Sequence, residues 1–204
     1  MQNDLAIDEF WEWFSLHSDR LRSVEGNANK ESLLDEIMHR LHAIDAGLYL
    51  EVSKPHGGVN DLVVTAEGMR ALFPLVDAVI GRAPKLAGWK FTALRSPMGF
   101  GFGLKMGPIR LNPDEIWFLP LTVGAQQKHF GVRLAVDDIV SANAPGAANA
   151  AWILLDTVLG ERRIAETIEH VEVEVLPDHA RELGYFRLSE LEEYLALRDS
   201  QRGA

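Results

Sequence analysis

The stretch LYLEVS, residues 48–53, determines which kind of fold this chain is expected to adopt. Leu48, Leu50 and Val52 are apolar and alternate with residues that tolerate water, which is the pattern of a strand with one buried face. Upstream, residues 5–45 instead follow the period of about 3.6 residues that is typical of two amphipathic helices. The sequence therefore predicts a change from helix to strand at this point.

From residue 47 onward, the order strand–strand–helix–strand occurs twice, in 47–95 and again in 115–177. The elements are expected at 48–53, 61–65, 67–80 and 89–93 in the first repeat and at 115–121, 129–136, 146–159 and 170–175 in the second. Turns at 55–58 and 124–127 join the first two strands of each repeat. The two repeats differ in sequence but have the same order of strands and helix. This agreement indicates an internal duplication that is preserved in pattern and not in residue identity.

The alternation in these strands also predicts the fold class. Parallel sheets that are buried on both faces need continuous apolar runs, and the six strands lack them. We therefore predict an α+β fold with one six-stranded sheet, mainly antiparallel or mixed, that has helices on one face. Two N-terminal helices and one C-terminal helix complete it.

A chain of 204 residues can form one large domain or two small ones. We predict a single domain over 1–204. Besides the two repeats, it contains a helical pair at 5–45, a connection rich in glycine and proline at 96–114, and a C-terminal helix with a tail at 178–204. A short hairpin from Leu104 to Leu111 is expected inside the connection.

The composition limits the function classes. With 47% hydrophobic and 25% charged residues, the chain is expected to fold, and its net charge of −10 disfavours a nucleic-acid surface. The absence of cysteine excludes disulfides, thiolate metal sites and cysteine nucleophiles. Neither a secretory signal nor an apolar run long enough for a bilayer is expected, so we predict a cytoplasmic protein without membrane contact.

Two motifs resemble known binding sites, but the spacing of their residues does not match those sites. The glycines at 101, 103 and 107 resemble a dinucleotide loop, but Pro108 follows where a helix would have to begin. Asp35, His39 and His42 share one helix face and are suitable metal ligands, yet the two histidines lack the spacing of a zinc-binding helix. We expect a solvated helix face there, and neither a metal nor a cofactor.

A composite surface is the strongest candidate site. If the apolar residue of each strand faces the helices, the opposite face displays Lys90, Trp117, Arg133, Glu172 and Glu174. Tryptophan and arginine supply much of the binding energy in protein interfaces. The sequence therefore predicts a non-enzymatic binding or regulatory module whose partner is another protein, and a second copy of the chain is one candidate.

A small-molecule enzyme is the alternative. Its site would use dispersed residues, namely His129, His170, Glu172 and Arg133. A deep pocket that holds several of these residues with shifted pKa values would favour the enzyme, whereas a flat face would favour the binding module.

Several short segments together resemble a family of bacterial proteins that is defined by a domain of unknown function. The segments are Leu72-Phe73-Pro74, Gly88-Trp89, residues 116–120, Leu154-Leu155-Asp156 with Leu159-Gly160-Glu161, and residues 173–177. The resemblance covers most of residues 10–177 and implies a cytoplasmic bacterial protein. It implies no reaction, cofactor or catalytic residue, and the glycine-rich part of the connection, residues 99–107, departs from the family pattern.

Overall fold

The computed structural model describes residues 2–22, 30–53, 56–121 and 129–202. Its helices and strands confirm the α+β class. The chain divides into two compact units, Met1–Ser96 and Pro97–Ala204. Each unit has its own sheet, and the single domain expected over 1–204 stays a prediction.

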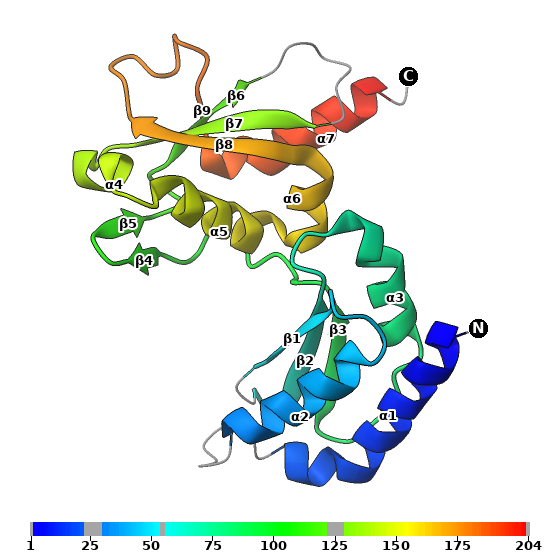
Figure 1. Ribbon diagram of the computed structural model, residues 1–204. Coiled ribbons are helices and arrows are strands. Elements are labelled where there is room, and N and C mark those ends of the chain that lie inside the picture. Colours follow the sequence, from blue (N-terminus) through cyan, green and yellow to red (C-terminus); the bar gives the residue numbers. More distant parts are fainter. Residues whose placement is uncertain (1, 23–29, 54–55, 122–128, 203–204) are drawn as a thin grey trace. The chain divides into compact units, whose positions relative to one another are not determined.

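The first unit contains two N-terminal helices followed by the first repeat (Figure 1). Its strands form one sheet in the order β1-β2-β3, in which β1 and β2 are antiparallel and β2 and β3 are parallel. The elements are α1 Gln2–Leu21, α2 Lys30–His42, β1 Tyr49–Val52, β2 Asn60–Thr65, the short 3-10 helix Arg70–Leu72, α3 Phe73–Gly81 and β3 Trp89–Ala93.

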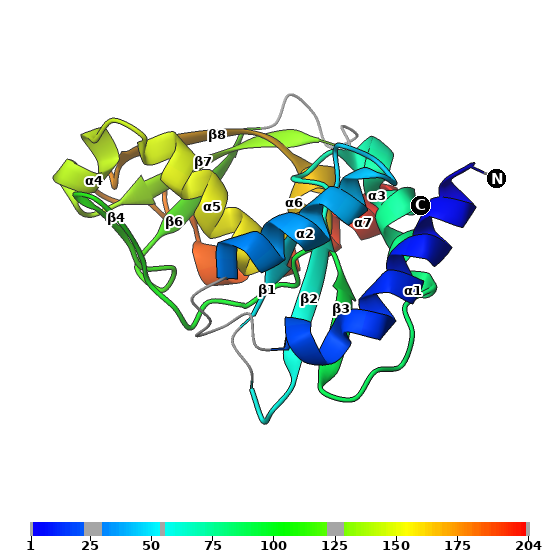
Figure 2. The ribbon, with the colours of Figure 1, turned by 60° about the horizontal axis from the view of Figure 1, so that its bottom comes forward.

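Aromatic side chains form much of the contact between α1 and this sheet. Phe10, Trp11 and Phe14 are buried, as their helical spacing predicts for a core stripe. The Trp11 ring meets Phe91 of β3 edge-on at 4.7 Å, and Phe14 meets Trp89 in the same way at 5.0 Å. Figure 2 shows α1 alongside the strands of this unit. The stripe therefore serves as core.

The helix predicted at 67–80 begins later, at Phe73. Pro74 explains the difference, because proline lacks an amide hydrogen and is tolerated only in the first turn of a helix. Residues 66–72 instead form a turn and the short 3-10 helix.

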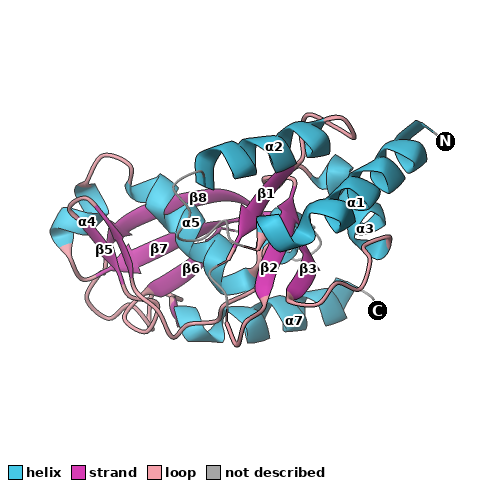
Figure 3. Ribbon diagram, turned by 90° about the horizontal axis from the view of Figure 1, so that it is seen from below, coloured by secondary structure: helices cyan, strands magenta, loops and turns pink. Residues whose placement is uncertain are grey.

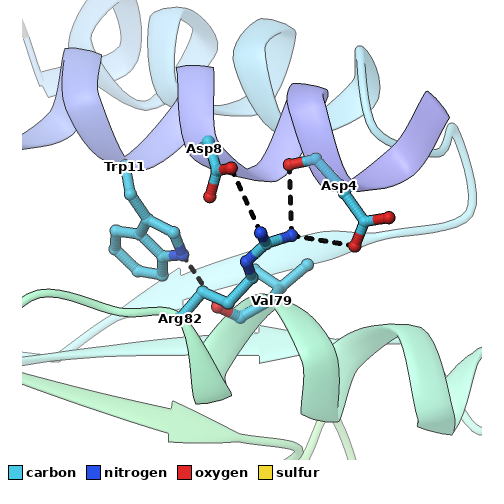
Figure 4. Close-up of polar contacts among 5 residues, drawn as sticks. All are labelled: Asp4, Asp8, Trp11, Val79 and Arg82. Atoms are coloured by element: carbon cyan, nitrogen blue, oxygen red, sulfur yellow. Dashed lines mark hydrogen bonds and ion pairs between the residues drawn. The ribbon is translucent and has the colours of Figure 1, made fainter. Parts of the chain in front are cut away.

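A buried hydrogen bond and an exposed ion-pair cluster fasten α1 to the end of α3 (Figure 4). The indole Nε1 of Trp11 donates to the Val79 carbonyl at 2.7 Å. The guanidinium of Arg82 lies 2.9 Å from the carboxylate of Asp4 and 3.1 Å from that of Asp8. These contacts join elements that are far apart in the sequence.

The second unit begins with a hairpin and continues with the second repeat. The hairpin lies inside the predicted connection and confirms the one expected from Leu104 to Leu111. The elements are β4 Leu104–Met106, β5 Ile109–Leu111, β6 Trp117–Leu121, β7 Phe130–Val136, α4 Ile139–Asn143, α5 Ala147–Leu159, α6 Glu161–Thr167, β8 Ile168–Val175, β9 Phe186–Arg187, the 3-10 helix Leu188–Glu190 and α7 Leu191–Arg202.

The prediction of one six-stranded sheet is wrong. The described strands form three sheets: β1-β2-β3, the pair β4-β5, and β8-β7-β6-β9. Figure 3 shows the strands β1, β2 and β3 of the first sheet and β6, β7 and β8 of the third. Alternation shows which face of a strand is buried but does not show which strands pair, and here each repeat forms a sheet of its own. The two repeats nevertheless share one topology, an antiparallel hairpin followed by a helical crossover to a parallel strand beside the second strand of the hairpin.

Helices cover one face of the four-stranded sheet and a loop covers part of the other. On the helix side, Phe118, Val132 and Leu134 are buried against residues of α5 and α7. On the opposite side, the segment of residues 176–185, which we call the covering segment, places Ala180 and Tyr185 against the sheet. Only part of that second face is therefore open.

Some expected features fall on residues that the structure leaves undescribed. The turn predicted at 124–127 lies outside the described residues, as does Pro55 in the turn at 55–58. Within the described ranges, no helix is both long and apolar enough to cross a bilayer.

Candidate functional site

Strand register places four of the five candidate residues on the loop-covered face of the four-stranded sheet. Trp117 of β6 lies opposite Ala135 of β7, which in turn lies opposite Glu174 of β8. One row further along the sheet, Arg133 lies opposite Glu172. Because side chains directly opposite one another share a face, these residues form one surface.

The fifth candidate, Lys90, lies in the first unit. Its ammonium is 2.7 Å from a carboxylate oxygen of Asp61, and the hydroxyl of Thr92 donates to the other oxygen at 2.7 Å. The composite face expected from one shared sheet is thus divided between two sheets, which removes Lys90 from the surface described above.

Arg133 is the centre of a charged cluster. Its Nε atom lies 2.8 Å from Oε2 of Glu172 and 3.7 Å from Oε2 of Glu174. The Nε2 atom of His170 lies 3.0 Å from the second oxygen of Glu172. The pKa of Glu172 is held below its ordinary value mainly by the hydrogen bond from Arg133, and next by the hydrogen bond from His170. The same bond between Arg133 and Glu172 raises the pKa of Arg133.

Tyr185 connects this cluster to the covering segment. Its hydroxyl donates to the carboxylate of Glu174, while its ring is buried against Ala135 and Ala180. Burial is the main cause that raises the pKa of the Tyr185 hydroxyl, and the hydrogen bond to Glu174 adds to it. Nothing in the sequence pattern marked this residue, because the covering segment has no regular period.

Two arginines of the same region lie over Trp117. The guanidinium carbon of Arg187 is 4.2 Å from the centre of a Trp117 ring, and that of Arg181 is 5.5 Å away. Arg181 also forms ion pairs with Glu190. The hydrogen bond from Arg181 is the main cause that lowers the pKa of Glu190. The indole is half-buried, so its accessible edge lies beside two cations. The sequence could not predict these contacts, because alternation does not show which residues pack against β9 and the covering segment.

The structure also places the residues of the two other hypotheses. The enzyme alternative needs His170, Glu172 and Arg133 together, and they are in contact, whereas His129 directly precedes β7. Asp35, His39 and His42 lie on α2, where the ring of His42 meets Tyr49 edge-on at 5.9 Å. In the described ranges, no group of three or more metal-ligating side chains is close enough to hold an ion.

The pKa shifts of Glu172 and Tyr185 make these two groups unsuited to proton transfer at neutral pH. A general acid or base works best when its pKa lies near the working pH. Here the pKa of Glu172 is lowered from 4.5 and that of Tyr185 is raised from 10.0, so both shifts lead away from neutrality. At neutral pH the cluster therefore offers a carboxylate, a guanidinium and a protonated phenol.

Comparisons of this chain with protein-family models, with curated proteins and with solved structures found no match. The resemblance to a bacterial family stays a prediction, and the function is argued below from the chemistry of the site.

Proposed function

We propose that this chain is a non-enzymatic module that binds another protein through the polar face of its four-stranded sheet. The observation that carries the proposal is the Arg133 cluster, in which one guanidinium faces the carboxylates of Glu172 and Glu174. The cluster keeps a surplus of negative charge on a surface that is about one-third exposed. A cytoplasmic location belongs to the proposal, and the cysteine-free composition is compatible with it.

Around Glu172 and Glu174, the chemistry of this face selects a partner with a basic segment, whereas Arg181 and Arg187 place positive charge at the Trp117 end. The side chains of Glu172 and Glu174 are 40% and 35% exposed, so a lysine or arginine from outside can reach them. Such a contact is a charge-assisted hydrogen bond, the stronger kind of polar contact. The net charge of −10 adds attraction at longer range, which speeds the encounter with a basic protein.

Affinity capture with charge-neutral variants tests this proposal. The full chain is used as bait in an extract, as wild type and as the double variant Glu172→Gln with Glu174→Gln. A matched control carries Glu192→Gln and Glu193→Gln on the exposed side of α7. We expect the first double variant to lose a partner that the control retains, and we expect higher salt to release that partner from the wild type.

Measurement with the purified partner completes the test. The dissociation constant is expected to rise about tenfold or more when both carboxylates are neutralised, which corresponds to about 1.4 kcal/mol. Equal affinity of the wild type and the Glu172→Gln, Glu174→Gln variant would show that the face is only solvated surface.

A small-molecule enzyme remains the second candidate, and the contact between His170 and Glu172 is the observation that favours it. A thermal-shift screen with small metabolites separates the two functions. A compound that raises the melting temperature of the wild type but not of Arg133→Met would support the enzyme.

A further inference from the structure

The sheet of the first unit ends at an open strand, and two hydrogen bonds fix how that strand is oriented. β3 is the edge strand of the order β1-β2-β3. The amide of Asn60 donates to the Gly88 carbonyl at 3.0 Å, and the amide of Leu94 donates to the Val64 carbonyl at 2.8 Å. In a parallel pair, the residues of one strand alternately face the neighbour and face away. The even-numbered residues from 88 to 94 therefore bond to β2.

The odd-numbered residues of β3 direct their backbone groups to the open edge. The amide of Trp89 is used within the chain, since it donates to the Leu86 carbonyl at 3.2 Å. Phe91 and Ala93 follow it along the strand. Their N–H and C=O groups point away from β2, so this edge can accept a further strand.

A cavity lies directly beside this edge. It is a shallow groove, widely open to solvent, between β3 and the segment of residues 83–87. Seven of its eight lining residues are of apolar type, among them Ile80, Pro84, Leu86, Trp89 and Phe91. We call it the β3 groove. A side chain that lies opposite Phe91 on an added strand shares the face of Phe91 and so enters the groove.

The wall of the groove is held in place from behind. The Trp11 ring packs edge-on against Phe91, and its indole nitrogen is hydrogen-bonded to the Val79 carbonyl at the end of α3. Arg82, which leads into the segment of residues 83–87, is fixed to α1 by Asp4 and Asp8 (Figure 4). A groove with fixed walls loses less entropy when a ligand binds.

A lysine at the groove favours an anionic ligand. Lys85 lines the groove and is exposed. In the described part of the chain, no carboxylate lies within ion-pair distance of its ammonium. The chain as a whole carries a charge of −10, so this local cation is the feature that would select a carboxylate on the ligand.

We propose that the β3 groove binds an extended peptide segment of a partner protein, which adds a strand to β3. The segment pairs with the backbone groups of Phe91 and Ala93, places an aliphatic side chain in the groove and directs an acidic side chain to Lys85. The site is separate from the Arg133 cluster and takes the opposite charge.

A designed peptide tests the proposal on the full chain. The probe is the fluorescein-labelled peptide Thr-Glu-Thr-Leu-Thr-Glu-Thr, amidated at its C-terminus, in which both glutamates share the face of the leucine. Control peptides carry glycine in place of leucine, or lysine in place of both glutamates. We expect saturable binding of the probe by fluorescence anisotropy, with a dissociation constant at least about tenfold higher for either control.

Two variants and one matched control locate the binding. Ala83→Phe fills the groove from its rim and is expected to abolish binding, while Lys85→Glu is expected to weaken it about tenfold. Lys105→Glu changes an exposed lysine of the other unit and should leave affinity within about twofold. If Ala83→Phe fails to fold by circular dichroism, Lys85→Glu decides the result, since its side chain is exposed.

Hydrogen exchange distinguishes strand addition from other contacts. On addition of the probe, the amides of Phe91 and Ala93 should become protected from exchange. Absence of binding up to about 1 mM, which corresponds to a very weak complex, would overturn the proposal. Binding without protection of these amides, or with unchanged affinity in both variants, would overturn it too. A dimer that Ala83→Phe abolishes would show that a second copy of the chain occupies the groove, and this result also contradicts the proposal.

Discussion

The hydroxyl of Tyr185 donates a hydrogen bond to the carboxylate of Glu174, and this bond joins the covering segment to the edge strand β8. The ring of the same tyrosine is buried against Ala135 and Ala180. The ring of this one side chain therefore packs against the apolar part of the face, while its hydroxyl reaches the charged part.

Tyr185→Phe keeps the packed ring and removes only this hydrogen bond. We expect the free energy of unfolding to fall by about 1 kcal/mol, the net value of one hydrogen bond. Tyr49→Phe is the matched control, because Tyr49 is 40% exposed and should give almost no change. Denaturant unfolding of both variants measures the difference, and equal effects would show that the bond contributes nothing.

The same substitution changes stability at high pH. The pKa of Tyr185 is raised above its ordinary value of 10.0, mainly by burial, so its protonated form is favoured in the folded protein. Its contribution is therefore complete below pH 10 and is lost as the pH rises through the folded pKa. We expect the melting temperature of the wild type to fall more steeply above pH 10 than that of Tyr185→Phe.

Arg133→Met is expected to weaken the acid dependence of stability. In the wild type, Arg133 lowers the pKa of Glu172, so stability is lost as the pH falls below 4.5. Without the guanidinium, Glu172 loses the largest cause of its lowered pKa, so less of the stability depends on its ionisation. The melting temperature of the variant should then fall less below pH 4.5 than that of the wild type.

Two substitutions compare the buried and the exposed contacts between α1 and α3. Trp11→Phe removes the 2.7 Å hydrogen bond to Val79 and leaves space beside the ring of Phe91, so we expect a loss of about 2 kcal/mol. Arg82→Ala removes ion pairs with carboxylates that are 63% and 59% exposed, so we expect a smaller loss, which decreases further at high salt. Urea titrations at two salt concentrations test this ranking, which a larger effect of Arg82→Ala would contradict.

Gly160 lies between α5 and α6 with φ of 78° and ψ of 155°, a conformation that is nearly restricted to glycine. Gly160→Ala should therefore destabilise the protein by about 2 kcal/mol. Gly101→Ala is the control, since no positive φ is required there and no atom lies within 4 Å of the added carbon. It should be neutral or stabilise by about 0.5 kcal/mol, because alanine restricts the unfolded chain. Thermal melts that rank the two in the opposite order would contradict this reading.

The sequence predicted local structure well and pairing poorly. Alternation located the strands and the buried side of each, as Leu62, Val64 and Phe118 show, because period two follows directly from strand geometry. It could not show that β3 and β8 end separate sheets, since pairing depends on contacts between distant segments. The prediction of one shared sheet therefore combined two faces that belong to different units.

The candidate site shows the same limit. The alternation of side chains along β6, β7 and β8 placed four residues on one face, namely Trp117, Arg133, Glu172 and Glu174. Their role in binding stays a prediction. Tyr185 and the arginines at 181 and 187 escaped notice because the covering segment is irregular and its neighbours are set by tertiary contacts. Charged residues on an alternating strand can be assigned to a face, but the loop that covers that face cannot.

The shared topology of the two repeats has a consequence for the order in which the chain folds. Each hairpin, β1 with β2 and β6 with β7, joins segments that are close in sequence, whereas β3 and β8 pair only after a helix has been crossed. Closing a longer loop costs more chain entropy before the first contact forms. We therefore expect both hairpins to nucleate early and the parallel strands to join late. Substitutions in β3 and β8 would then accelerate unfolding and leave the rate of folding almost unchanged.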